Sequence, residues 1–167
     1  MKRVLMRVVT GSLLAAWMVV VFLFSAQPAV RSEKMSGGFA YRIVKQADRL
    51  FDLGMTEKQM EQQAKKIDYP VRKGAHMTEY AVLGCLAFAF FRSLTPLIQR
   101  KRELWAWCFA VVYAMTDEIH QLSVPGRAGR FTDVCTDATG AAIGIILLFL
   151  IRKIWQTCCE KRKHLIQ

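Results

Sequence analysis

The sequence predicts an all-α fold: a four-helix transmembrane bundle with short amphipathic helices on the membrane surface in its first outer loop. Two observations lead to this prediction. Hydrophobic residues make up 53% of the 167-residue chain and gather in four runs, whereas a soluble globule spreads them along amphipathic elements. The 24 Lys and Arg residues lie between and beyond the runs, as in the loops of membrane proteins. We therefore expect a single membrane domain over residues 1–167.

The first predicted span covers residues 8–24 and follows a basic start. A cleaved signal peptide is the alternative, because it begins in the same way. Cleavage after Ala26 or Ala29 would leave Phe24 or Gln27 at a position that requires a small residue. The sequence thus favours a retained transmembrane helix.

Three more spans are predicted at residues 71–91, 104–124 and 133–151. Each is close to the length of about 20 residues that crosses a bilayer as a helix. Each also contains ionisable residues, which lower its mean hydropathy. Their positions therefore bear on function.

The long loop between the first two spans also has a helical pattern. Apolar residues recur at helical spacing, with charges on the opposite face, at Phe39, Ile43, Ala47 and Leu50. A second short helix is expected from Thr56, because Gln59 completes a capping box. We interpret both as helices lying on the membrane surface; a mostly disordered linker is the alternative.

The arrangement of charge predicts an orientation. Four spans place both termini on one side, where Lys and Arg form short runs beside the helix ends. The long loop instead mixes its cations with acids. Short basic flanks stay in the cytoplasm, so we expect cytoplasmic termini, with residues 25–70 and 125–132 outside. The net charge of +11 indicates anionic lipid headgroups and not nucleic acid, because no basic groove remains once the helices lie in lipid.

Three polar stretches, residues 72–80, 117–121 and 133–137, are predicted to lie at one depth. At the α-helical rise, Glu79, Asp117 and Asp137 would stand about 18, 20 and 21 Å from the cytoplasmic ends of their helices. All three carboxylates would then reach the outer third of the bilayer.

The same stretches each place their polar residues on one helix face. These faces are His76, Glu79 and Tyr80; Asp117, His120 and Gln121; and Asp133 and Asp137 with Gly140 and Gly144. The glycine pair suits close helix contact, and ionisable groups avoid lipid, so the faces should turn inward. We predict a polar pocket that opens outward and is capped by the tight turn at Pro125 and Gly126. Arg127 and Arg130 in this turn can offer paired donors to a carboxylate or phosphate.

These residues resemble the VanZ-like family of small bacterial membrane proteins. The resemblance rests on Phe24-Ser25-Ala26-Gln27-Pro28, Arg72-Lys73-Gly74-Ala75-His76 with Tyr80, Asp117-Glu118-x-His120-Gln121, Pro125-Gly126-Arg127, Asp133, and Asp137-x-x-Gly140. Asp137 departs from the family, which often has Asn there. The resemblance implies a role in the cell envelope linked to tolerance of glycopeptides and of the lipoglycopeptide teicoplanin. Some members carry a phosphotransbutyrylase label, which an outward-facing pocket fits badly.

Ligand binding is the first hypothesis for the pocket. The arginines, a lysine and the N–H groups of the turn could hold the pyrophosphate of a lipid-linked wall precursor at the outer leaflet. The predicted ligand-binding residues are Arg72, Lys73, Gln121, Arg127, Arg130, Asp133 and Asp137.

The competing hypotheses are an enzyme and a purely structural cluster. The predicted acid and base groups are His76 with Glu79, and His120 with Asp117 and Glu118. The same set could hold a divalent metal, which we do not favour because no dense metal motif is present. In the structural alternative, Arg127 or Arg130 pairs with Asp117 or Asp133 and fixes helix register. Four short spans lack the broken-helix repeat of a transporter, and the first helix is free to pack or form a homo-oligomer.

Overall fold

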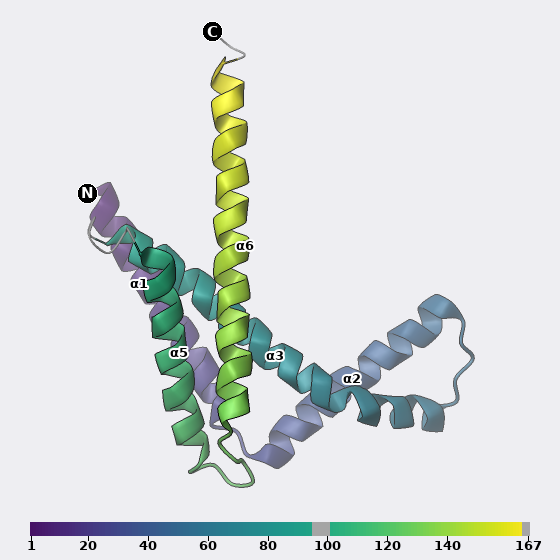
Figure 1. The fold of residues 1–167 in the computed structure, drawn as a ribbon. Helices are drawn as coiled ribbons and strands as arrows, with labels where there is room; N and C mark the ends of the chain where they lie inside the picture. The colour runs from purple at the N-terminus through teal and green to yellow at the C-terminus, as the bar shows by residue number, and fades with distance from the viewer. Residues whose placement is uncertain (95–100, 165–167) are drawn as a thin grey trace.

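The computed structural model describes residues 1–94 and 101–164, and this part of the chain forms five helices and no strands (Figure 1). The predicted all-α fold is therefore confirmed. Three helices, α1, α3 and α6, are long and apolar enough to cross a membrane. The five helices are α1 (Lys2–Ser25), α2 (Ala29–Phe51), α3 (Glu57–Ser93), α5 (Arg102–Gln121) and α6 (Phe131–His164).

The predicted third span corresponds to α5, which has 20 residues but is not among the three candidate spans. Its last two turns carry polar side chains in place of apolar ones, at Asp117, Glu118, His120 and Gln121. Three of the four predicted spans are thus candidate spans by length and hydropathy, and α5 is not.

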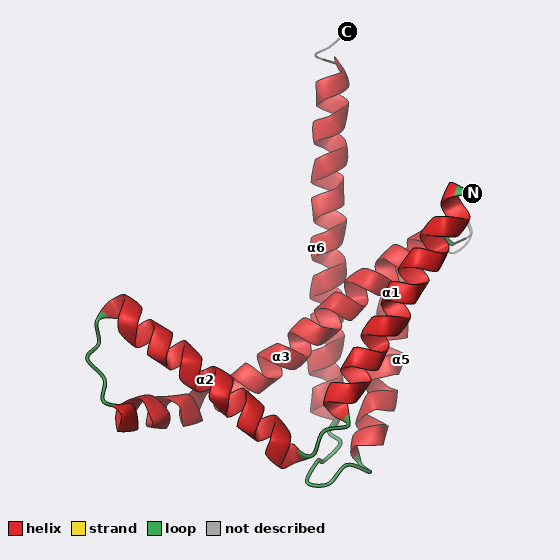
Figure 2. Cartoon of the chain, turned by 180° about the vertical axis from the view of Figure 1, so that it is seen from behind, coloured by secondary structure: helices red, strands yellow, loops and turns green. Residues whose placement is uncertain are grey.

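The core lies where α1, α5 and α6 meet α3, which crosses them obliquely (Figures 1 and 2). On α5 the buried positions are alanines four residues apart, Ala106, Ala110 and Ala114. Small residues at this spacing let neighbouring helices approach closely. Larger side chains from α3, including Tyr80, Leu83 and Phe88, fill the centre.

The crossing of α3 and α6 is built from glycines. A Cβ on Gly84 would come within 2.5 Å of the Ala141 carbonyl oxygen. A Cβ on Gly140 or Gly144 would likewise overlap backbone atoms of α3. The prediction that the Gly140 and Gly144 face points into the bundle is confirmed, because only hydrogen fits at these positions.

Two hydrogen bonds from aromatic side chains join α1 to its neighbours. Trp17 Nε1 donates to the carbonyl oxygen of Glu79 in α3 at 2.9 Å. The Tyr113 hydroxyl of α5 donates to the carbonyl oxygen of Met18 at 2.6 Å. With Leu14 and Val21 buried, α1 forms part of the core.

Replacing Tyr113 with phenylalanine should lower the free energy of unfolding by about 0.5–1.5 kcal/mol, because one hydrogen bond between helices is lost. Unfolding by denaturant in micelles measures the effect. Tyr41→Phe is the matched control, since no hydrogen bond from the Tyr41 hydroxyl appears in the described part of the chain. Equal stability of Tyr113→Phe and wild type would show that this bond adds nothing.

Helix α2 and the first half of α3 form a hairpin that projects from the bundle (Figure 2). Ala40 and Val44 of α2 pack against Met60 and Ala64 of α3. The apolar face predicted from the sequence is not the face that packs on α3. Its residues Phe39, Ile43 and Leu50 are exposed on the surface of the protein. An apolar face left uncovered by the protein is what a helix on a membrane surface presents to lipid.

The helix predicted from Thr56 begins as expected but does not end as expected. The capping box is present, with the Thr56 amide donating to Gln59 Oε1 at 2.8 Å. The helix then continues through Pro70 for 37 residues, so the predicted surface helix and the predicted second span are one element. Pro70 has no N–H to donate, but the packing of both halves of α3 outweighs that loss. Helix α6 likewise runs past the predicted end at residue 151.

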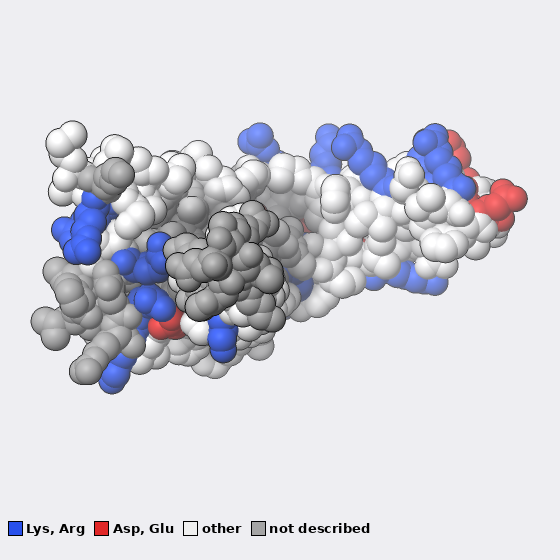
Figure 3. Space-filling model, turned by 90° about the horizontal axis from the view of Figure 1, so that it is seen from above, with Lys and Arg blue, Asp and Glu red and all other residues white. Residues whose placement is uncertain are grey.

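Both termini lie at one end of the bundle, and the 122–130 turn lies at the other (Figure 1). Figure 3 looks onto the terminal end and shows Lys and Arg around it and along both edges of the hairpin. The predicted basic turn at residues 92–103 lies partly outside the described residues, because 95–100 are not described.

Candidate functional site

A polar cavity of about 340 Å³ lies at the end of the bundle that carries the 122–130 turn. The start of α2, the middle of α3, the turn and the start of α6 form its walls. Its charged and polar lining consists of Glu33, Tyr69, Arg72, Lys73, His76, Gln121, Arg127, Arg130 and Asp133. Four of these side chains are cations and two are carboxylates.

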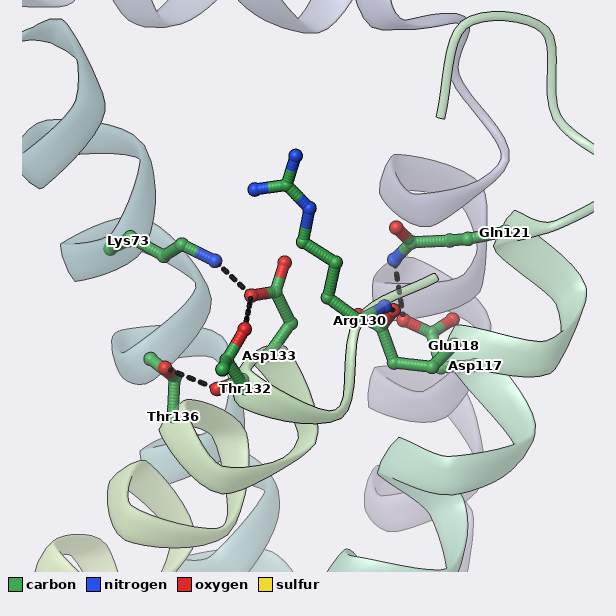
Figure 4. A network of polar contacts seen from close by, with 8 residues as sticks. All are labelled: Lys73, Asp117, Glu118, Gln121, Arg130, Thr132, Asp133 and Thr136. Carbon is green, nitrogen blue, oxygen red and sulfur yellow. Dashed lines mark hydrogen bonds and ion pairs between the residues drawn. The ribbon is translucent and has the colours of Figure 1, made fainter. Parts of the chain in front are cut away.

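Two of the cations are paired with the two carboxylates. Lys73 Nζ donates to Asp133 Oδ1, which also accepts the Thr132 hydroxyl at 3.2 Å (Figure 4). Arg72 lies 3.5 Å from Glu33 and 3.6 Å from Asp68. Lysine and arginine from α3 therefore neutralise acids from α6 and α2.

The other two cations, Arg127 and Arg130, have no carboxylate within ion-pair distance in the described part of the chain. Arg127 Nε donates to the carbonyl oxygen of Gln27 at 3.3 Å. Arg130 uses its backbone amide, which donates to Glu118 Oε2 at 2.8 Å. In Figure 4 its guanidinium points away from that contact and away from every dashed line.

The prediction that Arg127 or Arg130 pairs with an aspartate and fixes helix register is wrong in this form. Neither Arg127 nor Arg130 pairs with Asp117 or Asp133. The reason is the path of the turn, which brings the Arg130 backbone against α5 and sends its side chain outward. Asp133 takes Lys73 as its partner instead.

The predicted tight turn is present and is fixed to the start of α2. Gly126 has a φ of +75°, a left-handed conformation that favours glycine. The carbonyl oxygen of Pro125 accepts the Ala29 amide at 3.2 Å. The backbone around Arg127 is thus held between α1 and α2.

His76 and Glu79 stand together beside the cavity. His76 Nδ1 lies 3.7 Å from Glu79 Oε2, too long for a strong hydrogen bond. Glu79 lines an adjoining cavity of about 180 Å³, which shares Arg72, His76 and Arg127 with the first. The histidine therefore touches both spaces.

Below the cavity, polar groups of α5 bind the end of α1. Gln121 Nε2 donates to Ser25 Oγ at 3.0 Å and to Asp117 Oδ2 at 3.3 Å. Ser25 was not among the predicted site residues, although it belongs to the Phe24–Pro28 motif. Glu33 and Tyr69 were also missed, because both lie in the loop that was interpreted as surface helices.

The three carboxylates predicted at one depth, Glu79, Asp117 and Asp137, belong to α3, α5 and α6, which pack against one another. Asp137 is 2% exposed, and its Oδ1 has no hydrogen-bond partner in the described part of the chain. Asp117 Oδ1 and the Tyr80 hydroxyl are likewise buried without a partner there. Within the described ranges, none of these three residues belongs to the cavity lining, although Asp137 was predicted to bind the ligand.

His120 is not brought into the cavity. It lies on the side of α5 that faces α1, where the centroid of its ring is 4.6 Å from the centroid of the Phe22 ring. Of the described residues that line this cavity, none is His120, Asp117 or Glu118, and Glu118 instead lines a neighbouring groove. Across the described ranges, no three His, Cys, Asp or Glu side chains are placed to hold a metal ion.

Comparison with known proteins places this site within a family. A family model described as VanZ/LLP1 matches residues 11–152, which include every residue of the cavity lining. No curated protein and no solved structure matches the chain.

Proposed function

This chain belongs to the VanZ/LLP1 family, and from that premise we propose that it is a multi-pass membrane protein of the cell envelope that binds an anionic ligand in the cavity. The headgroup of a lipid-linked cell-wall precursor has the required chemistry. Binding of such a precursor would connect the protein with tolerance of glycopeptides.

The packing of α5 supports its assignment as a fourth span. Its polar residues Asp117, Glu118 and Gln121 are buried, whereas the neighbouring Ile119 and Leu122 are not covered by the protein. Polar side chains inside and apolar side chains outside are typical of a helix surrounded by lipid. The cations near the termini support a cytoplasmic location for both ends and an outward-facing cavity.

The unpartnered arginines are the observation that carries the proposal. Lys73 and Arg72 are matched by Asp133 and Glu33, so Arg127 and Arg130 give the cavity a net positive charge. A guanidinium binds phosphate oxygens through two parallel hydrogen bonds. A volume of about 340 Å³ accommodates a pyrophosphate group.

The pair formed by His76 and Glu79 favours a second candidate, a membrane-embedded hydrolase or transferase. Both residues border the cavities, and a histidine beside a carboxylate can transfer protons to a bound phosphate ester. If the protein is an enzyme, the wild type should turn over a phosphate ester, and His76→Gln should abolish this turnover and leave ligand affinity unchanged. If it is a binding protein, the wild type should show no turnover.

The proposal predicts how purified protein binds inorganic pyrophosphate, measured by titration calorimetry in a neutral detergent. Arg130→Gln and Arg127→Lys should each weaken binding by about tenfold or more, because tenfold corresponds to about 1.4 kcal/mol, the scale of one charge-assisted contact. Lysine keeps the charge of Arg127 but loses the planar pair of donors.

Arg42→Gln is the control for this titration, because Arg42 is an exposed cation of α2 outside the cavity. It should bind pyrophosphate like the wild type. The proposal fails if folded wild-type protein binds no pyrophosphate, or if Arg130→Gln binds it as tightly as the wild type does.

A further inference from the structure

An apolar groove of about 370 Å³ lies beside the cavity, between the end of α5 and the start of α6. Its apolar walls are Met115 and Ile119 of α5, Leu122 just after α5, and Phe131 and Val134 of α6, and Glu118 and Arg130 also line it. Three of these side chains are largely uncovered by the protein, with exposed fractions of 67% for Ile119, 66% for Leu122 and 75% for Phe131. The groove therefore opens toward the surroundings of the bundle.

Arg130 lines both the groove and the polar cavity. The bond from its amide to Glu118 holds this part of the turn against α5. Gly129 fits there because a Cβ would come within 2.7 Å of the Glu118 carbonyl oxygen. The backbone is thus fixed at the boundary between the polar cavity and the groove. Figure 4 shows the Arg130 guanidinium pointing away from α5.

A site with an anion-binding cavity and an adjoining apolar groove matches an amphiphilic ligand. Inside a bilayer, an apolar groove provides little extra hydrophobic attraction, because lipid tails are as apolar as leucine. What the groove provides is a mostly apolar route by which a hydrocarbon chain can leave the cavity past Arg130. A free phosphate ion has no apolar part that would occupy the groove.

Resting on the proposed function, we propose that the ligand is an anionic lipid: a phosphate or pyrophosphate monoester of a long hydrocarbon chain. Its headgroup binds Arg127 and Arg130, and its chain leaves along the groove between α5 and α6 into the outer leaflet. Arg130 marks the point at which headgroup and chain meet. The groove is then a lateral entrance from the membrane.

Two probes with the same headgroup test this proposal: farnesyl pyrophosphate, which has a chain, and inorganic pyrophosphate, which has none. Ile119→Trp fills the groove with an apolar side chain and should weaken binding of farnesyl pyrophosphate at least tenfold. It should leave binding of inorganic pyrophosphate unchanged. Val19→Trp is the control, because Val19 of α1 is 57% exposed and lines neither the cavity nor the groove.

Comparing variants in the same micelles removes the effect of probe partitioning, which is equal for all of them. Loss of farnesyl pyrophosphate binding in Ile119→Trp alone supports the lateral entrance. Equal farnesyl pyrophosphate binding by Ile119→Trp and Val19→Trp overturns it, even where inorganic pyrophosphate still binds and the proposed function stands. Failure of the wild type to bind either probe overturns the proposed function and this inference together.

Discussion

Replacing Gly140 with leucine is expected to prevent α3 from packing on α6 and to lower the free energy of unfolding by at least about 3 kcal/mol, the upper end of the usual cost of overpacking. The side chain would meet the backbone of Met77, which cannot rotate away as a side chain can. The two helices would have to separate along their whole contact. Denaturant unfolding in micelles and the yield of monodisperse protein both measure the loss.

Alanine substitutions provide a sharper form of this test. Gly140→Ala should still destabilise, because even its Cβ overlaps the Met77 backbone. Gly74→Ala in α3 should instead stabilise by about 0.5–1 kcal/mol, since nothing lies within 4 Å of its Cβ and alanine favours the helix. If both substitutions change stability in the same direction, the close crossing is not what determines the fold here.

Replacing Lys73 with methionine is expected to lower stability by about 2–3 kcal/mol, because it leaves Asp133 without its cation. Breaking a fully buried ion pair costs about 3–5 kcal/mol, and this pair is partly accessible, so the expected cost is smaller. The side chains of Lys73 and Asp133 are 21% and 25% exposed, respectively. Denaturant unfolding of the single variants and of the pair forms a double-mutant cycle.

The double variant Lys73→Met with Asp133→Leu separates structure from binding. Removing both charges should restore most of the lost stability, because no unpaired charge remains. If the pair also positions the ligand, binding of pyrophosphate should stay weak in this stable protein. Full binding by the double variant would show that the pair serves packing alone.

Much of the fold could be predicted from local sequence patterns. The apolar run predicted at 104–124 became α5 (Arg102–Gln121), and the capping box at Thr56 starts α3 as predicted. The common depth of Glu79, Asp117 and Asp137 stays a prediction from the α-helical rise, and Asp117 and Asp137 are both buried. These predictions needed only spacing along single helices.

The rest depends on how the helices are rotated and packed, which spacing does not fix. Local rules stop a helix before Pro70, but contacts on either side keep α3 continuous. Spacing along the helices also does not predict that Asp133 pairs with Lys73 and not with Arg127. That choice, like the turn of His120 toward Phe22, depends on the azimuth of each helix in the bundle.

Helix α6 has 34 residues, which at the α-helical rise is about 51 Å, against a hydrocarbon layer of about 30 Å. It therefore projects beyond the other helices at the end far from the cavity (Figure 1). Its tight contact with α3 at Gly140 and Gly144 lies near the opposite end. Asp133, the partner of Lys73, stands at that same end, in the first turn of the helix. One continuous helix therefore carries a residue of the polar site at one end and the projecting turns at the other.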